Sequence, residues 1–314
     1  MQAEYLVTGG AGFIGSNIVR RLLVENKPVR VLDNFSTGSR ENLSTLEGSL
    51  EVVEGDLRSA EAVAGALQGI RCVIHLGALP SVSRSIKDPQ ATHDVNITGT
   101  LNLLLRAREA GVERLVFSSS SSVYGDTKVL PKREDMTPQP KSPYALSKLA
   151  GEHYVRLFCE LYGLKTFSLR YFNVFGPRQN PHSQYAAVIP LFIDALQKKQ
   201  KLIIFGDGEQ TRDFTFVDDV VSANLACCEA PESAAGDVYN VAHGFRISIN
   251  QLATRLEELL GVKPGRDYQP SLPGDVRDSQ ADSSKAKQKL GWKPMAPFDE
   301  GLRRTVAWFQ HGKA

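Results

Sequence analysis

Residues 7–15 read VTGGAGFIG, in which Gly9, Gly12 and Gly15 lie three residues apart. The run EYLVT (4–8) ahead of them predicts a β-strand, and the apolar residues that recur every fourth position after them predict a helix. Turns collect glycine for steric reasons alone, so the triplet is weak evidence by itself. In the order strand, glycine turn, helix, it indicates a turn whose backbone N–H groups and helix start can receive an anion.

The same alternation of short apolar runs and longer amphipathic segments continues through the first half of the chain. Repeated strand, helix, strand units favour a parallel sheet that is covered by helices on both faces, and therefore an α/β fold. The expected strands are residues 4–8, 29–33, 51–55, 71–76, 114–118 and 165–170.

After about residue 172 the sequence changes in character, because Gly and Pro become frequent and the helical segments stand further apart. Ser248 with Gln251 three residues later predicts a capping box at a helix start, and Gly261 predicts its end. Residues 298–311 predict a final helix. With no repeat and no long linker, we expect this part to cover the carboxyl edge of the sheet, where ligands bind in open α/β sheets.

Composition excludes several classes of function. The 314 residues carry a net charge of +2 without a Lys/Arg block, so we expect no nucleic-acid partner. The chain starts without a basic, apolar leader and has no apolar run near the ~20 residues of a membrane span. The cysteines show no metal-binding spacing, so we expect no metal site, buried free thiols and a cytoplasmic location. These cysteines are Cys72, Cys159, Cys227 and Cys228.

Asp33 ends the second expected strand, 18 residues after Gly15. A carboxylate at this place accepts hydrogen bonds from an adenosine ribose diol and repels a 2′-phosphate. The sequence therefore predicts a dinucleotide cofactor, with NAD favoured over NADP. The spacing GxxGxxG differs from the GxGxxG of the simplest dinucleotide-binding folds.

Residues 142–148, SPYALSK, predict a helix start with a functional face. Ser142 suits the N-cap and Pro143 the first helical position. Tyr144 and Lys148 then share one face of the helix. An ammonium close to a phenol lowers the pKa of the phenol, so this pair predicts a base that acts near neutral pH. Tyr and Lys at this spacing also occur on many exposed helices.

Five motifs in one order carry a resemblance that covers essentially the whole chain: VTGGAGFIG, VNITGTLNLL (95–104), SSSSSVYG (118–125), YALSK (144–148) and LRYFNVFGPR (169–178). The sequence resembles the extended short-chain dehydrogenase/reductase superfamily and, within it, the UDP-hexose 4-epimerases. The resemblance implies a Rossmann-type doubly wound parallel sheet with a smaller C-terminal α/β substrate domain. It implies an NAD-binding domain over 1–172, to which some later segments return, and a domain over 173–314 that mainly binds the UDP-sugar.

The resemblance also implies roles for individual residues. The catalytic residues are Ser120, Tyr144 and Lys148. The residues expected at the cofactor are Gly9, Gly12, Phe13, Ile14, Gly15, Asp33, Asn34, Ser36, Thr37, Gly38, Asp56, Leu57, Leu76, Gly77, Ala78, Asn96, Ser118, Tyr144, Lys148, Tyr171, Asn173 and Val174. Those expected at the substrate are Ser81, Ser120, Ser121, Asn173, Val188, Ile203, Phe205, Arg212, Asp275 and Ser279.

The residues that follow Ser120 distinguish between reactions. Related 4,6-dehydratases typically carry an Asp-Glu pair there, and decarboxylases a Glu, whereas this chain has Ser121 and Ser122. A 4-keto sugar then has one simple fate, return of the hydride on its other face, so an isomerase is expected. The small Ser279 predicts that both plain and N-acetylated UDP-hexoses are converted. Alternatives are a UDP-uronate 4-epimerase, a decarboxylase without its Glu, another NAD-dependent nucleotide-sugar enzyme, and a non-catalytic NAD-binding regulator.

One position departs from the pattern of the resembled enzymes. Many of them carry an Arg near position 272 that holds the diphosphate, and this chain has Leu272. Arg178, Arg212 or Arg277 is expected to replace it. The resemblance further implies a homodimer formed through helices near 88–110 and 143–162.

Overall fold

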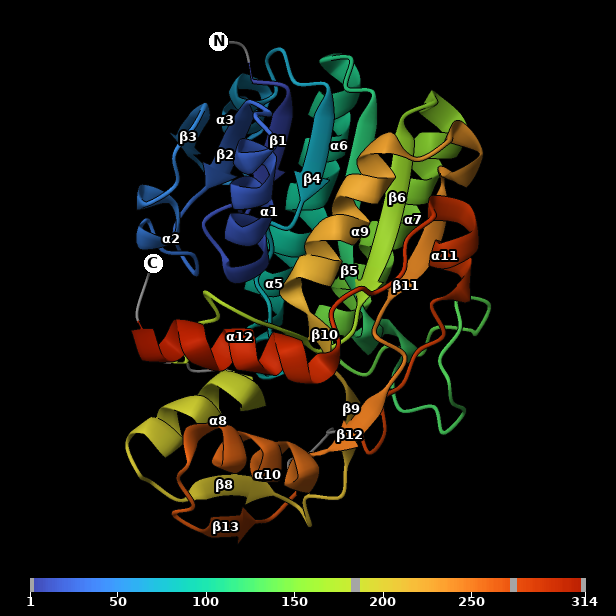
Figure 1. Ribbon diagram of the computed structural model, residues 1–314. Coiled ribbons are helices and arrows are strands. Elements are labelled where there is room, and N and C mark those ends of the chain that lie inside the picture. The colour runs from blue at the N-terminus through green and yellow to red at the C-terminus, as the bar shows by residue number, and fades with distance from the viewer. Residues whose placement is uncertain (1–2, 182–186, 272–275, 312–314) are drawn as a thin grey trace.

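The computed structural model describes residues 3–181, 187–271 and 276–311, and its largest element is a seven-stranded sheet in which all neighbouring strands are parallel (Figure 1). The strand order is β11-β6-β5-β4-β1-β2-β3. The strands are β1 (Tyr5–Thr8), β2 (Val29–Asp33), β3 (Leu50–Glu54), β4 (Cys72–His75), β5 (Arg114–Ser120), β6 (Lys165–Tyr171) and β11 (Asp237–Val241).

Helices cover both faces of this sheet, because successive side chains of each strand point to opposite faces. Val7 packs in a core cluster with residues of α1 (Phe13–Val24) and α9 (Val217–Glu229). Its neighbour Leu6 packs in a second cluster with residues of the helices on the other face. Those helices are α3 (Ala60–Ala66), α6 (Gly99–Glu109) and α7 (Pro143–Tyr162). The predicted doubly wound α/β fold is thereby confirmed.

The sequence located six of the seven strands to within one or two residues and missed β11. The predicted capping box is present, since Ser248 accepts a hydrogen bond from the Gln251 amide and the Gln251 side chain accepts one from the Ser248 amide. Gly261 ends the same helix in the left-handed conformation, at φ 66°. Ser142 caps α7 as expected, and its hydroxyl accepts a 3.1 Å hydrogen bond from the amide of Ala145.

The smaller part of the molecule has its own apolar core, in which α8 (Val188–Gln197), α10 (Ile249–Leu260) and α12 (Phe298–His311) pack together. Figure 1 shows α12 lying between the large sheet and the pair α8 and α10. Three two-stranded sheets complete this region and its junction. Their strands are β7 (Val174–Phe175), β8 (Leu202–Phe205), β9 (Thr211–Asp213), β10 (Thr215–Phe216), β12 (Arg246–Ser248) and β13 (Arg266–Gln269).

Short helical elements connect the larger ones. They are α2 (Glu41–Ser44), α4 (Val82–Lys87), α5 (Pro89–His93), a π-helix (Asp94–Thr98), two 3₁₀-helices (Ser121–Tyr124 and Glu232–Ala234) and α11 (Ser284–Leu290). Within the described ranges, no helix is both long and apolar enough to cross a membrane. The four cysteines are free thiols, of which Cys159 is half-buried and the other three are buried.

Candidate active site

A cavity of about 1260 Å³ runs along the carboxyl edge of the parallel sheet. Its walls come from the segments that follow β1, β2, β3, β4 and β6, from the last residues of β5, and from the first two turns of α7. Arg178–Pro181, Ala187 and the end of α12 close the side toward the smaller part. This is the position at which open α/β sheets bind their ligands.

The glycine turn is packed so closely that side chains are excluded. A Cβ on Gly15 would lie 2.2 Å from the carbonyl oxygen of Gly9, and Gly9 itself has φ +69°. α1 begins at Phe13, and its N-cap, Gly12, brings no side chain to cap the first turn. The N–H groups of a first turn that lacks a capping side chain suit a phosphate group.

Asp33 reaches the cavity from the end of β2 and is held by two backbone hydrogen bonds. The amide of Ala11 donates to Oδ2 at 2.9 Å, and the amide of Phe35 donates to Oδ1 at 2.8 Å. Asp56, on the next loop, accepts a 2.8 Å hydrogen bond from Asn34, and its pKa lies well below the usual range because Arg58 binds the carboxylate. With the glycine turn, these two carboxylates suit a dinucleotide.

Tyr144, Lys148 and the end of β5 meet at the centre of the cavity. The Lys148 ammonium nitrogen donates a 2.7 Å hydrogen bond to the carbonyl of Ser118 and lies 6.0 Å from the centre of the Tyr144 ring. Burial lowers the pKa of Lys148 to about 8. Ser120 shares a hydrogen bond with the Tyr144 hydroxyl. The three predicted catalytic side chains are thus brought together.

The pKa of Tyr144 differs from the sequence argument, in which Lys148 lowers it. In this structure desolvation of the phenol raises its pKa, and the hydrogen bond with Ser120 acts in the opposite direction. The spacing of Tyr144 and Lys148 on a helix says nothing about desolvation, which is the larger effect here. The predicted lowering was therefore wrong for this geometry.

The five serines of residues 118–122 have separate roles. The Ser118 carbonyl holds Lys148, and the Ser119 hydroxyl donates to the Glu152 carboxylate beneath the strand. Ser120 Oγ accepts hydrogen bonds from the amide of Ser122 at 3.2 Å and from its hydroxyl at 2.9 Å. Ser121 lines the cavity. The run is an ordered strand end followed by a 3₁₀ turn.

Asn96 supports the site without lining the cavity. It lies on the π-helix, and π-helical turns are frequent at functional sites. Its side chain accepts a 2.7 Å hydrogen bond from the Leu79 amide and donates to the Ser147 hydroxyl at 3.0 Å. Ser81, two residues beyond Leu79, has φ 106°, a strained conformation that non-glycine residues adopt mostly at functional sites. The loop after β4 is therefore held in a defined shape at the cavity wall.

Most of the residues expected at the cofactor line this cavity; Gly38 and Asn96 do not. The substrate set divides more evenly. Ser81, Ser120, Ser121 and Asn173 line the cavity, whereas Val188, Ile203, Phe205, Arg212 and Ser279 lie outside its lining. Asp275 and Leu272 lie outside the described residues.

The candidate diphosphate-binding arginines occupy different places. Arg178 lines the cavity, and burial lowers the pKa of its guanidinium. Arg277 forms a salt bridge with Asp207 at the surface, at 2.8 Å. Arg212 donates hydrogen bonds to the carbonyls of Thr211 and Arg277.

Several cavity residues were not anticipated from the sequence. Arg84 on α4 and the aromatic pair Trp308 and Phe309 on α12 belong to this group. Phe309 also packs against the core of the smaller part, so α12 connects that core to the cavity. No local pattern in the last helix distinguishes a residue at a cavity from one at the surface, and only the tertiary structure places Trp308.

Comparisons with known proteins agree with this geometry. A profile of the NAD dependent epimerase/dehydratase family matches residues 5–242. A UDP-glucose 4-epimerase of Mycolicibacterium smegmatis is 40% identical over 311 residues, 98% of each chain, and a UDP-glucuronate 4-epimerase of Thermodesulfobacterium geofontis is 38% identical over 97% of this chain and 95% of its own. A UDP-N-acetylglucosamine 4-epimerase from Methanobrevibacter ruminantium M1, solved in complex with UDP-N-acetylmuramic acid, is 39% identical with a TM-score of 0.94 over 99% of each chain.

Proposed function

This chain belongs to the NAD-dependent epimerase/dehydratase family, and we propose that it is an isomerase that inverts C4 of UDP-hexoses through a transient 4-keto intermediate. Its substrates are the pair UDP-glucose and UDP-galactose and the corresponding N-acetylated pair. The observation that carries the proposal is the meeting of Tyr144, Ser120 and Lys148 in the cavity, beside Ser121 and Ser122 where a dehydratase has carboxylates.

The residues around the glycine turn suit NAD. The first turn of α1 would hold the pyrophosphate, and Asp33 would accept hydrogen bonds from the adenosine ribose. Bound NAD would supply a reversible hydride acceptor for C4 of the sugar, so the reaction would have no net oxidation. The predicted division into 1–172 and 173–314 stays a proposal. α9 and β11 lie with the parallel sheet, which supports the expected return of later segments.

The side chains at the sheet edge handle the proton. Ser120 would donate a hydrogen bond to O4 of the sugar, and Tyr144 would remove the O4 proton as the hydride leaves. Lys148 would stabilise the phenolate and contact the nicotinamide ribose. Ser121 and Ser122 offer no carboxylate to remove the C5 proton or to protonate the C6 hydroxyl, so the 4-keto sugar turns over and is reduced again.

Incubation of the protein with UDP-glucose, UDP-GlcNAc and UDP-GlcA, followed by NMR of the products, tests this function. We expect the 4-epimers of the first two sugars and no net formation of NADH, from a protein that retains NAD on purification. Loss of the C6 hydroxyl or release of CO₂ would contradict the proposal. The T. geofontis relative makes a UDP-uronate 4-epimerase the second candidate, and conversion of UDP-GlcA alone would establish it.

Replacement of Ser279 by tyrosine is expected to separate the two pairs of substrates. Ser279 is half-buried, and its amide donates a 3.1 Å hydrogen bond to the carbonyl of Thr211, which places it on the face of the smaller part near β9. A bulky side chain there would exclude the 2-acetamido group, so turnover of UDP-GlcNAc falls ~100-fold while that of UDP-glucose is kept. Steady-state kinetics on both substrates measure the effect. An unchanged ratio of the two kcat/KM values would show that Ser279 does not determine acceptance of the 2-acetamido group.

We propose that the uridine diphosphate extends from the cavity toward the smaller part. Ile203 and Phe205 on β8 have 54% and 40% of their residue surface exposed, which supports a role as an apolar platform for uracil. Val188 and Arg212 are the other proposed contacts on this side. Arg178, which lines the cavity, is our candidate for the diphosphate-binding arginine in place of Leu272.

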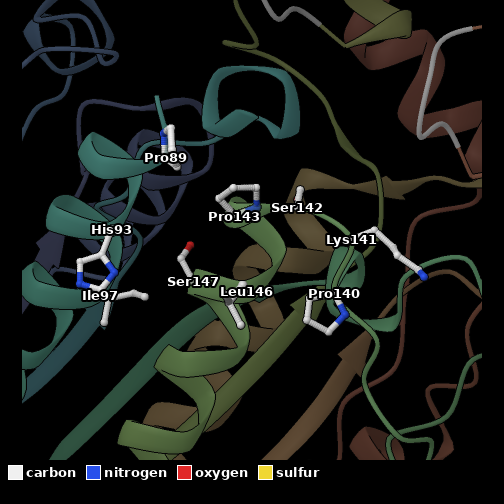
Figure 2. A pocket seen from close by; sticks show the side chains of 9 residues that line it. All are labelled: Pro89, His93, Ile97, Pro140, Lys141, Ser142, Pro143, Leu146 and Ser147. Carbon is white, nitrogen blue, oxygen red and sulfur yellow. The ribbon is translucent and has the colours of Figure 1, made fainter. Parts of the chain in front are cut away.

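We further propose a homodimer through the helices near 88–110 and 143–162, which are α5, the π-helix, α6 and α7. Leu146, Leu157 and Leu161 lie along α7 with 55%, 44% and 66% of their surface exposed. A hollow of about 510 Å³ lies beside Leu146. Its lining side chains come from the start of α7 and from α5 and the π-helix, as Figure 2 shows. Exposed apolar residues in a row favour contact with a second copy over contact with water.

The buried free thiols support our proposal of a cytoplasmic location.

The variant Leu157→Arg is expected to convert the dimer to a monomer, because it places a charge in the middle of this apolar row. Size-exclusion chromatography with light scattering measures the change in mass. Leu191→Arg, at a 45% exposed leucine on α8, is the matched control and should stay dimeric. A wild-type protein that elutes as a monomer would contradict the proposed assembly.

A further inference from the structure

Glu152 and Arg170 form a buried ion pair directly beneath the catalytic end of β5. Arg170 Nε donates to Glu152 Oε1 at 2.9 Å, and Arg170 Nη2 donates to Oε2 at 2.7 Å. Each side chain has only 4% of its surface exposed. The proton chemistry described above uses neither residue.

Glu152 lies close to Lys148 and to the strand end that carries Ser120. It lies four residues after Lys148 on α7, one helical turn further along the same face. The Ser119 hydroxyl donates to its Oε1. Ser119 lies between Ser118 and Ser120 on β5. The Ser118 carbonyl accepts a hydrogen bond from Lys148, and the Ser120 hydroxyl is hydrogen-bonded to Tyr144.

The two hydrogen-bond partners of Glu152 lie side by side on adjacent strands of the sheet. Ser119 of β5 lies opposite Arg170 of β6, and Arg170 lies opposite Asn240 of β11, so the three share one face of the sheet. Arg170 also stacks over Tyr124, with its guanidinium carbon 4.6 Å from the ring centre. One carboxylate therefore ties the helix that carries Tyr144 and Lys148 to the strand that carries Ser120.

Glu152 also opposes the effect of burial on Lys148. Burial is the larger influence and lowers the pKa of Lys148 to about 8, while the negative charge of Glu152 acts to raise it. The other groups near Lys148 are His75 on β4 and Tyr144 on α7. Arg170 on β6 pairs with Glu152 and also interacts with the charge of Glu134, whose carboxylate accepts a hydrogen bond from the Asn240 amide. Burial keeps His75 neutral, with a pKa of about 3, so Glu152 is the anion that stabilises the ammonium.

Stability alone does not account for an ion pair at this place. Removing two charges from water offsets most of their attraction, and an apolar pair of similar size often holds two elements together as well. The pair contacts the strand end and the helix turn that carry the proposed chemistry. This favours a role in that chemistry.

We propose that Glu152 is a positioning residue for the C4 epimerisation, acting through Ser119 on the geometry of Ser120 and through its charge on the protonation of Lys148. The inference rests on the proposed function and adds to it a residue outside the cavity lining. Arg170 orients the carboxylate and neutralises its second oxygen.

The variant Glu152→Gln tests the proposal in the NAD-containing protein. The neutral amide no longer stabilises the ammonium, so Lys148 loses its proton at a lower pH. The alkaline limb of the kcat–pH profile with UDP-glucose is expected to move about one pH unit toward acid. At pH 8 this shift lowers the protonated fraction of Lys148, and with it kcat, about fivefold, while KM changes less than about twofold and the defect is smaller at pH 6. A wild-type kcat and an unmoved alkaline limb would overturn the inference.

Two further variants separate positioning from folding. The double variant Glu152→Leu with Arg170→Met removes both charges. If the single variant loses activity only because Arg170 is left unpaired, kcat and thermal stability both return to wild-type values in the double variant. Recovery of stability with kcat still low and the limb still shifted supports the proposal, and full recovery of kcat overturns it. The double variant also decides the matter if the single one fails to fold.

Glu257→Gln is the matched control, because Glu257 forms a 2.9 Å ion pair with Arg266 in the smaller part of the molecule. It should leave the pH profile unchanged, and a limb shifted equally in this variant overturns the inference. Failure of the proposed function is distinguishable, since the wild-type protein would then convert none of the sugar nucleotides at any pH.

Discussion

Replacement of Tyr144 by phenylalanine is expected to reduce turnover of UDP-glucose about 10³-fold while NAD stays bound. The change removes one hydroxyl, and that hydroxyl lies where Ser120 and the sugar O4 meet in the proposed site. A positioned general base typically contributes 10²- to 10⁴-fold, roughly the size of this loss. The ring remains, so packing around α7 and the shape of the cavity are kept.

Measuring both turnover and bound NAD distinguishes loss of the catalytic base from loss of the cofactor. The bound cofactor is measured by absorbance after denaturation, and turnover by the amount of 4-epimer formed. Tyr154→Phe, at a half-buried tyrosine on the same helix, is the control and should keep wild-type rates. A Tyr144→Phe variant that retains more than a tenth of wild-type activity would falsify the assignment of the base.

The strands were predictable from the sequence because most are buried on both faces and read as apolar runs. β11 was missed for a physical reason. Asn240, the fourth of its five residues, is fully buried, and its polar side-chain groups are satisfied by partners far away in the sequence. Its side chain accepts a hydrogen bond from Tyr124 and donates to the carbonyls of Lys132 and Asp282. A strand of this kind resembles a loop until those partners are known.

The site was predictable where local chemistry determines it. The glycine turn and the strand that follows it indicated Asp33, and the helix start at Ser142 indicated Tyr144. Ser120 was selected only through the resemblance to the extended short-chain dehydrogenase/reductase superfamily. The rest depends on contacts between distant segments. The spacing of residues predicts neither the desolvation that raises the pKa of Tyr144 nor the position of Trp308 at the cavity.

The contact of Ser119, Glu152 and Arg170 beneath the strand shows the same limit more clearly. Glu152 has the spacing of an ordinary helical residue, and Ser119 is one of five identical letters. Only the register of β5 with β6 reveals that Ser119 and Arg170 stand side by side and face the same carboxylate. The residues that hold a catalytic group in place are harder to predict than the group itself, because their chemistry is spread over several elements.

Replacement of Gly15 by alanine is expected to deprive the protein of its cofactor. The new methyl group would lie 2.2 Å from the Gly9 carbonyl oxygen and 2.8 Å from the Cα of Gly10. Both are backbone atoms of the turn that faces the cavity, so the helix start must move away from the turn. Overpacking of this kind costs about 3 kcal/mol or more, which corresponds to ~100-fold weaker NAD binding.

Gly65 on α3 is the matched control, because a Cβ there meets no atom within 4 Å and alanine is a better helix former than glycine. Titration of each apoprotein with NAD measures the affinities, and circular dichroism checks that both variants are folded. We expect Gly65→Ala to bind NAD like the wild type and Gly15→Ala to be purified without cofactor and without turnover. The turn fixes the start of α1 and, through the Ala11 amide, the position of Asp33. A Gly15→Ala protein with wild-type affinity for NAD would therefore mean that NAD does not bind at this turn.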